Sequence, residues 1–177
     1  EFLRSNGRVD DAMRICNEVL NEHIDQPEAI FMLGRMLIDA GKFGFAHAMI
    51  MQFLRIKPNV GAAWNNLGRC YTDASKLDEA ERCFKRVLKL EPDDAVAMCN
   101  LSLTYLNRCE TKLAIEYGQR AVNAIPDYAQ AKQNLGLAHL MEHQWAEGWT
   151  NYESSINIDI SRKERIDASH MRQLDSV

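Results

Sequence analysis

The sequence has no long hydrophobic run, and none of its apolar stretches approaches the roughly 20 residues that a membrane-spanning helix needs. It also lacks an excess of charge of one sign, since 21 Lys and Arg residues face 25 Asp and Glu residues, for a net charge of −4. This near balance gives no general attraction to nucleic acid or to an anionic membrane. We therefore expect neither a nucleic-acid partner nor a membrane association.

Cysteines with metal-ligand spacing are absent as well. The five cysteines are odd in number and no Cys-x-x-Cys occurs, so neither a disulfide framework nor a zinc knuckle is indicated. We expect Cys16, Cys70 and Cys83 to be small buried side chains in helices, kept reduced in a cytoplasmic setting. The pattern described below places Cys109 in a turn and Cys99 at a position that can be exposed.

Residues arranged for catalysis are not evident. The sequence has no glycine-rich phosphate-binding loop. His139, Glu142 and His143 match the letters of the zinc-protease motif His-x-x-Glu-His, but a catalytic zinc takes three protein ligands and no third ligand follows. We interpret His139 as a packing residue and His143 as a turn residue, and we expect no metal, no cofactor and no enzyme activity.

What the sequence does contain is a repeat of 34 residues, here numbered so that Trp64 is at position 4. The recurring residues are leucine at position 7 (Leu33, Leu67, Leu101, Leu135), a small residue at position 8 (Gly34, Gly68, Ser102, Gly136), a small residue at position 20 (Ala12, Ala46, Ala80, Ala114, Gly148) and proline at position 32 (Pro58, Pro92, Pro126). Small residues at 8 and 20 let two helices pack closely, and the proline ends the second helix. Asp94 and Asp127 follow two of the prolines and are predicted to cap the next helix.

This pattern resembles the tetratricopeptide repeat (TPR) family over roughly residues 1–160, with Trp64, Leu67, Gly68, Tyr71, Ala80, Phe84 and Pro92 forming one complete copy. The resemblance implies an all-α fold, a right-handed α-solenoid of stacked antiparallel helix pairs. In each pair helix A lines the concave face and helix B the convex face. The predicted units of this one solenoid are a partial repeat at 1–26 (the end of helix A plus helix B), whole repeats at 27–60, 61–94, 95–128 and 129–162, and a capping helix or tail at 163–177.

The repeat register also predicts how the chain begins. Residue 1 falls at position 9 of its repeat, inside a helix A, so we expect a fragment of a longer array. A trimmed array exposes an apolar stacking face, because terminal repeats normally carry a polar cap. Association between copies through such terminal repeats is therefore one alternative for the function.

Three asparagines spaced by 34 residues are the main candidates for binding. Asn66, Asn100 and Asn134 occupy position 6, on the helix A surface that lines or borders the concave groove in TPR domains. An amide offers a donor and an acceptor, as a peptide backbone does, so the row suits an extended peptide. The row resembles the asparagine ladder in the TPR arm of O-GlcNAc transferase, although Met32 interrupts it in the first whole repeat. The alternative is that these amides bond neighbouring helix backbones.

Other polar residues extend this candidate site. Asn65, Gln130 and Gln133 add amides, and Arg35 and Arg69 recur at position 9. The arginines either bind an acidic ligand group or form ion pairs with the aspartates four residues later. The carboxylate clamp of chaperone-binding TPRs is rejected, because only its middle asparagine is matched and most of its cations are missing.

The favoured function is thus a non-catalytic scaffold that binds a protein or peptide. One alternative comes from residues 145–153, whose Trp145, Gly148, Trp149 and Tyr152 resemble the last repeat of bacterial and phage-type proteins in which TPRs precede a glycosyltransferase domain. That resemblance implies a substrate-presenting arm of a larger enzyme.

Overall fold

The computed structural model describes residues 26–156, and every regular element in this range is a helix. The predicted partial repeat at 1–26, except its last residue, and the predicted cap or tail at 163–177 lie outside these residues. The helices are α2 (Pro27–Asp39), α3 (Phe43–Ile56), α4 (Gly61–Asp73), α5 (Leu77–Leu90), α6 (Ala95–Asn107), α7 (Thr111–Ala124) and α8 (Ala129–Met141), followed by a helix over residues 145–156. None of them is long and apolar enough to cross a membrane.

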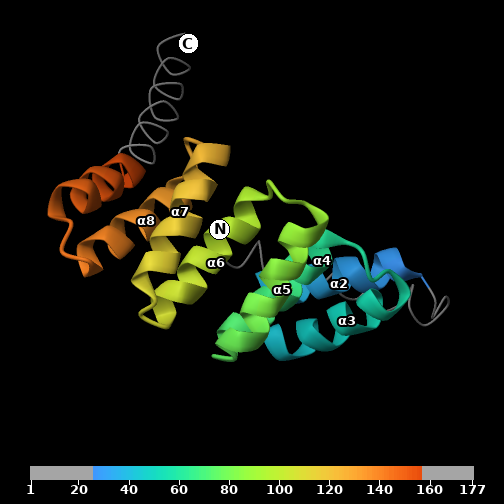
Figure 1. Cartoon of the computed structure of the whole chain (residues 1–177). Coiled ribbons are helices and arrows are strands. Elements are labelled where there is room, and N and C mark those ends of the chain that lie inside the picture. The colour runs from blue at the N-terminus through green and yellow to red at the C-terminus, as the bar shows by residue number, and fades with distance from the viewer. Residues whose placement is uncertain (1–25, 157–177) are drawn as a thin grey trace, which may run out of the picture. The chain divides into compact units, whose positions relative to one another are not determined.

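The helices follow the 34-residue period. The four A helices α2, α4, α6 and α8 each have 13 residues and begin at 27, 61, 95 and 129, the predicted first residues of the repeats. The B helices α3, α5 and α7 each have 14 residues and end two residues before a proline. The chain divides into two compact units, Glu1–Pro92 and Asp93–Val177. In each unit of Figure 1 the helices form antiparallel pairs.

Contact between positions 8 and 24 sets the distance between helices A and B. A Cβ atom added to Gly68 would lie 2.4 Å from Cε1 of Phe84, and one added to Gly34 would lie 2.8 Å from Cγ1 of Ile50. In the third repeat the sizes are exchanged, with Ser102 at position 8 facing Gly118 at position 24. The Ser102 hydroxyl donates a hydrogen bond of 2.8 Å to the carbonyl of Ala114 at position 20. In these three repeats the residue at position 8 is therefore in close contact with the residue at position 24.

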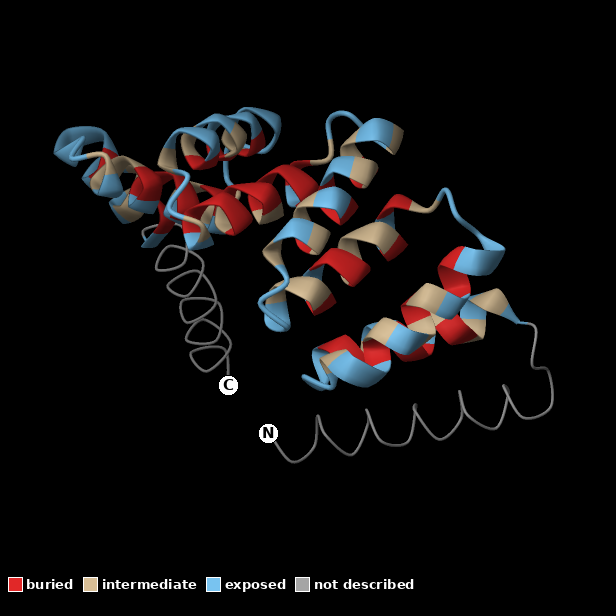
Figure 2. Ribbon diagram, turned by 60° about the horizontal axis from the view of Figure 1, so that its bottom comes forward, coloured by how far each residue is buried: buried red, intermediate tan, exposed pale blue. Residues whose placement is uncertain are grey.

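The core lies where the helices meet, and Figure 2 shows it as the buried inner faces of the helices. The four leucines at position 7 and the alanines at position 20 in α3, α5 and α7 are buried. In the first unit Phe31 stacks on Phe53 with ring centres 4.7 Å apart. These apolar contacts are the main favourable contribution to folding.

One of the two predicted helix caps is correct. The Asp94 carboxylate accepts a hydrogen bond of 2.6 Å from the backbone N–H of Ala97, at the start of α6. The prediction for Asp127 is wrong, because Tyr128 is the residue that precedes α8 and no side chain caps that helix. Asp127 lies one residue too early, at position 33, and its carboxylate is instead 4.0 Å from the Lys132 amine.

Candidate functional site

The A helices of the first unit carry a polar surface. Helices α2 and α4 are in contact, and α4 places Asn65 and Asn66 side by side, both half-buried. Asn66 precedes the buried Leu67, so the inner side of the helix holds the core while the asparagine lies at its edge. Asn66 is therefore accessible in part and held on a rigid element.

The arginines predicted for the site are both exposed. Arg35 lies on α2 and Arg69 on α4, at the same repeat position. In the part of the chain that the structure describes, neither forms an ion pair with the aspartate four residues later. The intrahelical ion pairs considered as an alternative are therefore not formed, and both guanidinium groups remain accessible to a ligand.

In the second unit Asn134 has a structural role. Its side chain is only 4% exposed, and its amide donates to the backbone carbonyl of Cys99 on α6 at 3.2 Å. Its carbonyl oxygen accepts a hydrogen bond of 3.1 Å from Gln130. The Asn134 amide thus bonds the backbone of a neighbouring helix and links α8 to α6, which is the alternative that we considered to peptide binding.

The remaining predicted residues of this unit lie closer to the surface. Asn100 is half-buried on α6, and Gln130 and Gln133 are exposed on α8, where Gln130 also donates to Gln133 at 3.3 Å. Val96 and Leu137 are exposed on the same two helices. This face therefore combines amides with apolar side chains, whereas the face of the first unit combines amides and cations with the exposed Met32.

Position 15 has a backbone role that the sequence did not reveal. Gly41, Ser75, Cys109 and His143 recur every 34 residues, and all four have φ between 57° and 69°. This left-handed conformation ends helix A and allows the turn into helix B. His143 is thus a turn residue, as predicted, and Nδ1 of His139 lies 2.5 Å from Oε1 of Gln144. Among residues 26–156 no group of three or more His, Cys, Asp or Glu is placed to hold a metal ion.

Comparison with known proteins identifies one repeat by its sequence. The sequence profile described as tetratricopeptide repeat matches residues 61–94, the copy that contains Trp64 and Phe84. Residues 61–94 are therefore a tetratricopeptide repeat. No curated protein matches it in sequence.

Solved structures with the TPR fold agree with this assignment. A crystal structure of MamA superposes with a TM-score of 0.78 at 22% identity, covering 91% of this chain and 94% of MamA. MamA from Desulfovibrio magneticus RS-1, from residue 41 to its end, gives 0.78 at 22% identity and 89% coverage of both chains. YrrB, described as a TPR protein with an unusual peptide-binding site, gives 0.69 at 16% identity, covering 96% of this chain and 87% of YrrB.

These likenesses confirm the predicted fold class, an all-α solenoid of TPR helix pairs. Together with the TPR profile they support a protein-interaction scaffold. The resemblance of residues 145–153 to repeats linked to a glycosyltransferase stays a prediction.

The TPR packing also explains the cysteines. Cys70, Cys83 and Cys99 are buried, and Cys109 is exposed in its turn. The exposed position considered for Cys99 is wrong, because α8 packs on α6 and Asn134 contacts the Cys99 sulfur at 3.5 Å. Burial raises the pKa of Cys70 and Cys99 to about 11 and that of Cys83 to about 12.

We expect Cys109 to react with iodoacetamide in the native protein while these three thiols resist. At pH 8 a thiol with a pKa near 11 is ionised in about one molecule in a thousand, and only the thiolate reacts. Peptide mapping by mass spectrometry after a short exposure measures the modification at each site. Fast modification of Cys99 in the native protein would contradict the packing of α8 on α6.

Proposed function

We propose that this TPR protein is a non-catalytic interaction module that binds an extended peptide along the surface of its A helices. The observation that carries the proposal is the recurrence of Asn66 and Asn100 at position 6 of consecutive repeats, each half-buried beside a buried leucine. Helix propensity does not favour an asparagine there, since asparagine is an indifferent helix former. The peptide-binding site named in the description of YrrB gives independent support.

The chemistry of the site follows from the amide group. Each asparagine can donate to a backbone carbonyl of the ligand and accept from a backbone N–H, so the ligand is held independently of its sequence. Each such bond contributes about 1 kcal/mol net. Asn65 extends the polar surface on α4, and the exposed Gln130 and Gln133 take the ligand-binding role that the buried Asn134 does not.

Neighbouring side chains supply the selectivity. Arg35 and Arg69 are exposed in the first unit and bind acidic side chains of the ligand. Val96 and Leu137 are exposed in the second unit and bind apolar side chains. The surface of the first unit therefore favours an extended segment with acidic side chains, and that of the second unit favours one with apolar side chains.

The test uses peptides selected from a random display library on the wild-type protein. We expect Asn66→Ala together with Asn100→Ala to weaken binding of the selected peptides at least about 30-fold, since the loss of one hydrogen bond at each asparagine already amounts to about 2 kcal/mol. Fluorescence anisotropy with dye-labelled peptides measures the dissociation constants. The control is Asn123→Ala, which removes an exposed asparagine on α7, a B helix.

The free energy of unfolding distinguishes the structural role of Asn134 from the ligand-binding role proposed for Asn66. Asn134→Ala should lower the free energy of unfolding by about 1 kcal/mol because it removes a buried hydrogen bond between α8 and α6. Asn66→Ala should leave it nearly unchanged.

Equal binding by wild type and the Asn66/Asn100 double variant would rule out the proposed site.

A further inference from the structure

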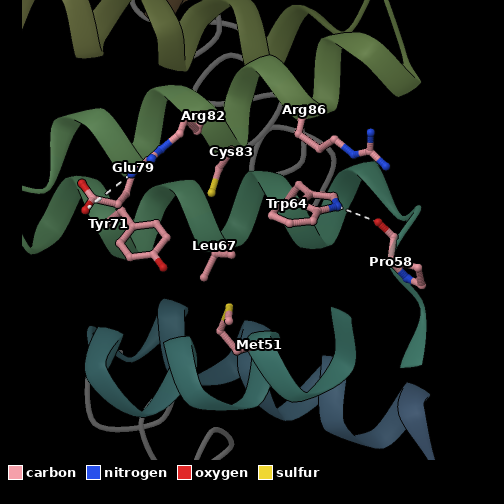
Figure 3. Close-up of a pocket in the computed structure, with 9 residues that line it drawn as sticks. All are labelled: Met51, Pro58, Trp64, Leu67, Tyr71, Glu79, Arg82, Cys83 and Arg86. Atoms are coloured by element: carbon pink, nitrogen blue, oxygen red, sulfur yellow. Dashed lines mark hydrogen bonds and ion pairs between the residues drawn. The ribbon is translucent and has the colours of Figure 1, made fainter. Parts of the chain in front are cut away.

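A groove lies in the first unit, between the B helices α3 and α5, with α4 as its floor. Figure 3 shows Met51 of α3 on one side and the side chains of α5 on the other, with Trp64, Leu67 and Tyr71 of α4 between them. The groove has a volume of about 500 Å³. Its remaining lining residues are Pro58, Glu79, Arg82, Cys83 and Arg86.

The floor of this groove is aromatic and held in place. The Trp64 indole N–H donates a hydrogen bond of 2.7 Å to the carbonyl of Pro58, which fixes the ring at one end. The ring of Tyr71 is in edge contact with His47, with centres 5.1 Å apart, which fixes the other end. Both rings are half-buried, so part of each remains open to a ligand. An apolar side chain can pack on them without rearranging the protein.

The thiol and phenol groups that line the groove also carry no charge at neutral pH. Burial raises the pKa of the Cys83 thiol to about 12 and raises the pKa of Tyr71 as well. Both groups therefore stay protonated, and Cys83 is neither an anion nor a nucleophile. The charges that a ligand meets are those of the rim.

The rim is formed by two arginines on one face of α5. Arg82 and Arg86 are four residues apart. A guanidinium nitrogen of Arg82 lies 3.7 Å from a carboxylate oxygen of Glu79, and 74% of the Arg82 side chain is exposed. A nitrogen of Arg86 donates a hydrogen bond of 3.0 Å to the Asn59 side chain, which holds the guanidinium beside the groove. Like charges at this spacing destabilise a helix, and a bound carboxylate relieves the repulsion.

The fold itself does not require these arginines. At position 22 the other described repeats have Ala48, Glu116 and Thr150, and at position 26 they have Gln52, Arg120 and Ser154. Likewise, Trp64 and Tyr71 on the floor correspond to Lys132 and His139 in the last repeat. The aromatic floor and the arginine pair therefore occur together only in the repeat 61–94, among the repeats within residues 26–156.

We infer that this groove is a second peptide-binding site, which takes an apolar side chain followed by an acidic one. The apolar side chain packs between Trp64 and Tyr71, and the carboxylate binds Arg82 and Arg86. The two arginines outnumber the single carboxylate of the lining, that of Glu79, so the charge at the rim favours an acidic–apolar peptide over a basic or neutral one. The site is separate from the surface of Asn66 and Asn100, because it is bounded by B helices.

The experiment follows the indole N–H signal of Trp64 by NMR during titration with an acetylated, amidated peptide of sequence Gly-Ser-Phe-Glu-Ser-Gly. We expect this signal to shift on addition of the peptide while those of Trp145 and Trp149 do not. Exchanging Glu for Gln in the peptide should weaken binding about tenfold, because a charge-assisted hydrogen bond is lost. The absence of a Trp64 shift would overturn the proposal.

Two matched variants assign the effect to the rim. Arg82→Thr with Arg86→Ser installs the residues of the last repeat at these positions, and we expect it to weaken binding about tenfold. Arg120→Ser removes the arginine at position 26 of the following repeat and should leave binding unchanged. Circular dichroism checks that both variants keep their helix content. Equal loss in both variants, or no loss in the first, contradicts the assignment.

Discussion

Phe84→Ala is expected to lower the free energy of unfolding by about 3–5 kcal/mol, the largest effect that we predict. The Phe84 side chain is fully buried, and its ring fills the space left by Gly68 on the neighbouring helix. The change removes the apolar contacts of the ring and leaves a cavity between α4 and α5. Urea denaturation followed by circular dichroism measures the loss.

A second substitution at the same contact tests its cause. Gly68→Ala in the wild type should cost about 1–3 kcal/mol, because the new methyl group would lie 2.4 Å from the Phe84 ring. In the Phe84→Ala background the ring is gone, and Gly68→Ala should instead stabilise by up to about 1 kcal/mol through helix propensity. The exchanged pair Ser102 and Gly118 shows the same compensation within this chain. An effect of the same sign in both backgrounds would contradict the pairing of positions 8 and 24.

Gly136→Ala is expected to cost about 3 kcal/mol. A Cβ atom at this position would lie 2.9 Å from the carbonyl oxygen of Gly148 and 2.9 Å from the backbone nitrogen of Tyr152. Backbone atoms cannot rotate away as a side chain does, so α8 and the helix over residues 145–156 must move apart. Thermal or urea unfolding measures the change.

The control for Gly136 is Gly44, in the first turn of α3. No atom lies within 4 Å of a Cβ added to Gly44, so Gly44→Ala should stabilise by up to about 1 kcal/mol. A similar loss of stability for both glycines would mean that close helix contact is not the reason for Gly136.

The fold could be predicted because its determinants recur at fixed positions. Leu67 and its counterparts mark the core, and the prolines mark where the B helices end, so the period alone placed the starts of the A helices. The error at Asp127 has a local cause, since a cap works only from the residue directly before the helix. The exchange of sizes between Ser102 and Gly118 was not predicted, because it joins residues on different helices.

The candidate site was predictable only in part. Repeat position identified Asn66 and Asn100 as surface residues of the A helices, and both are half-buried there. It could not show that Asn134 is bonded to Cys99, because that contact depends on how closely α8 packs on α6. The groove between α3 and α5 was missed for a similar reason. Its floor and its rim come from three helices, and Trp64 had been interpreted only as part of the repeat pattern.

The most direct test of peptide binding along the A helices is the NMR spectrum of the asparagine side-chain amides during titration with a display-selected peptide. Our account predicts that the amide signals of Asn66 and Asn100 shift with a common dissociation constant. The signal of Asn134, whose amide is bonded to Cys99, should change little. Unchanged signals of Asn66 and Asn100 at saturating peptide would contradict the account.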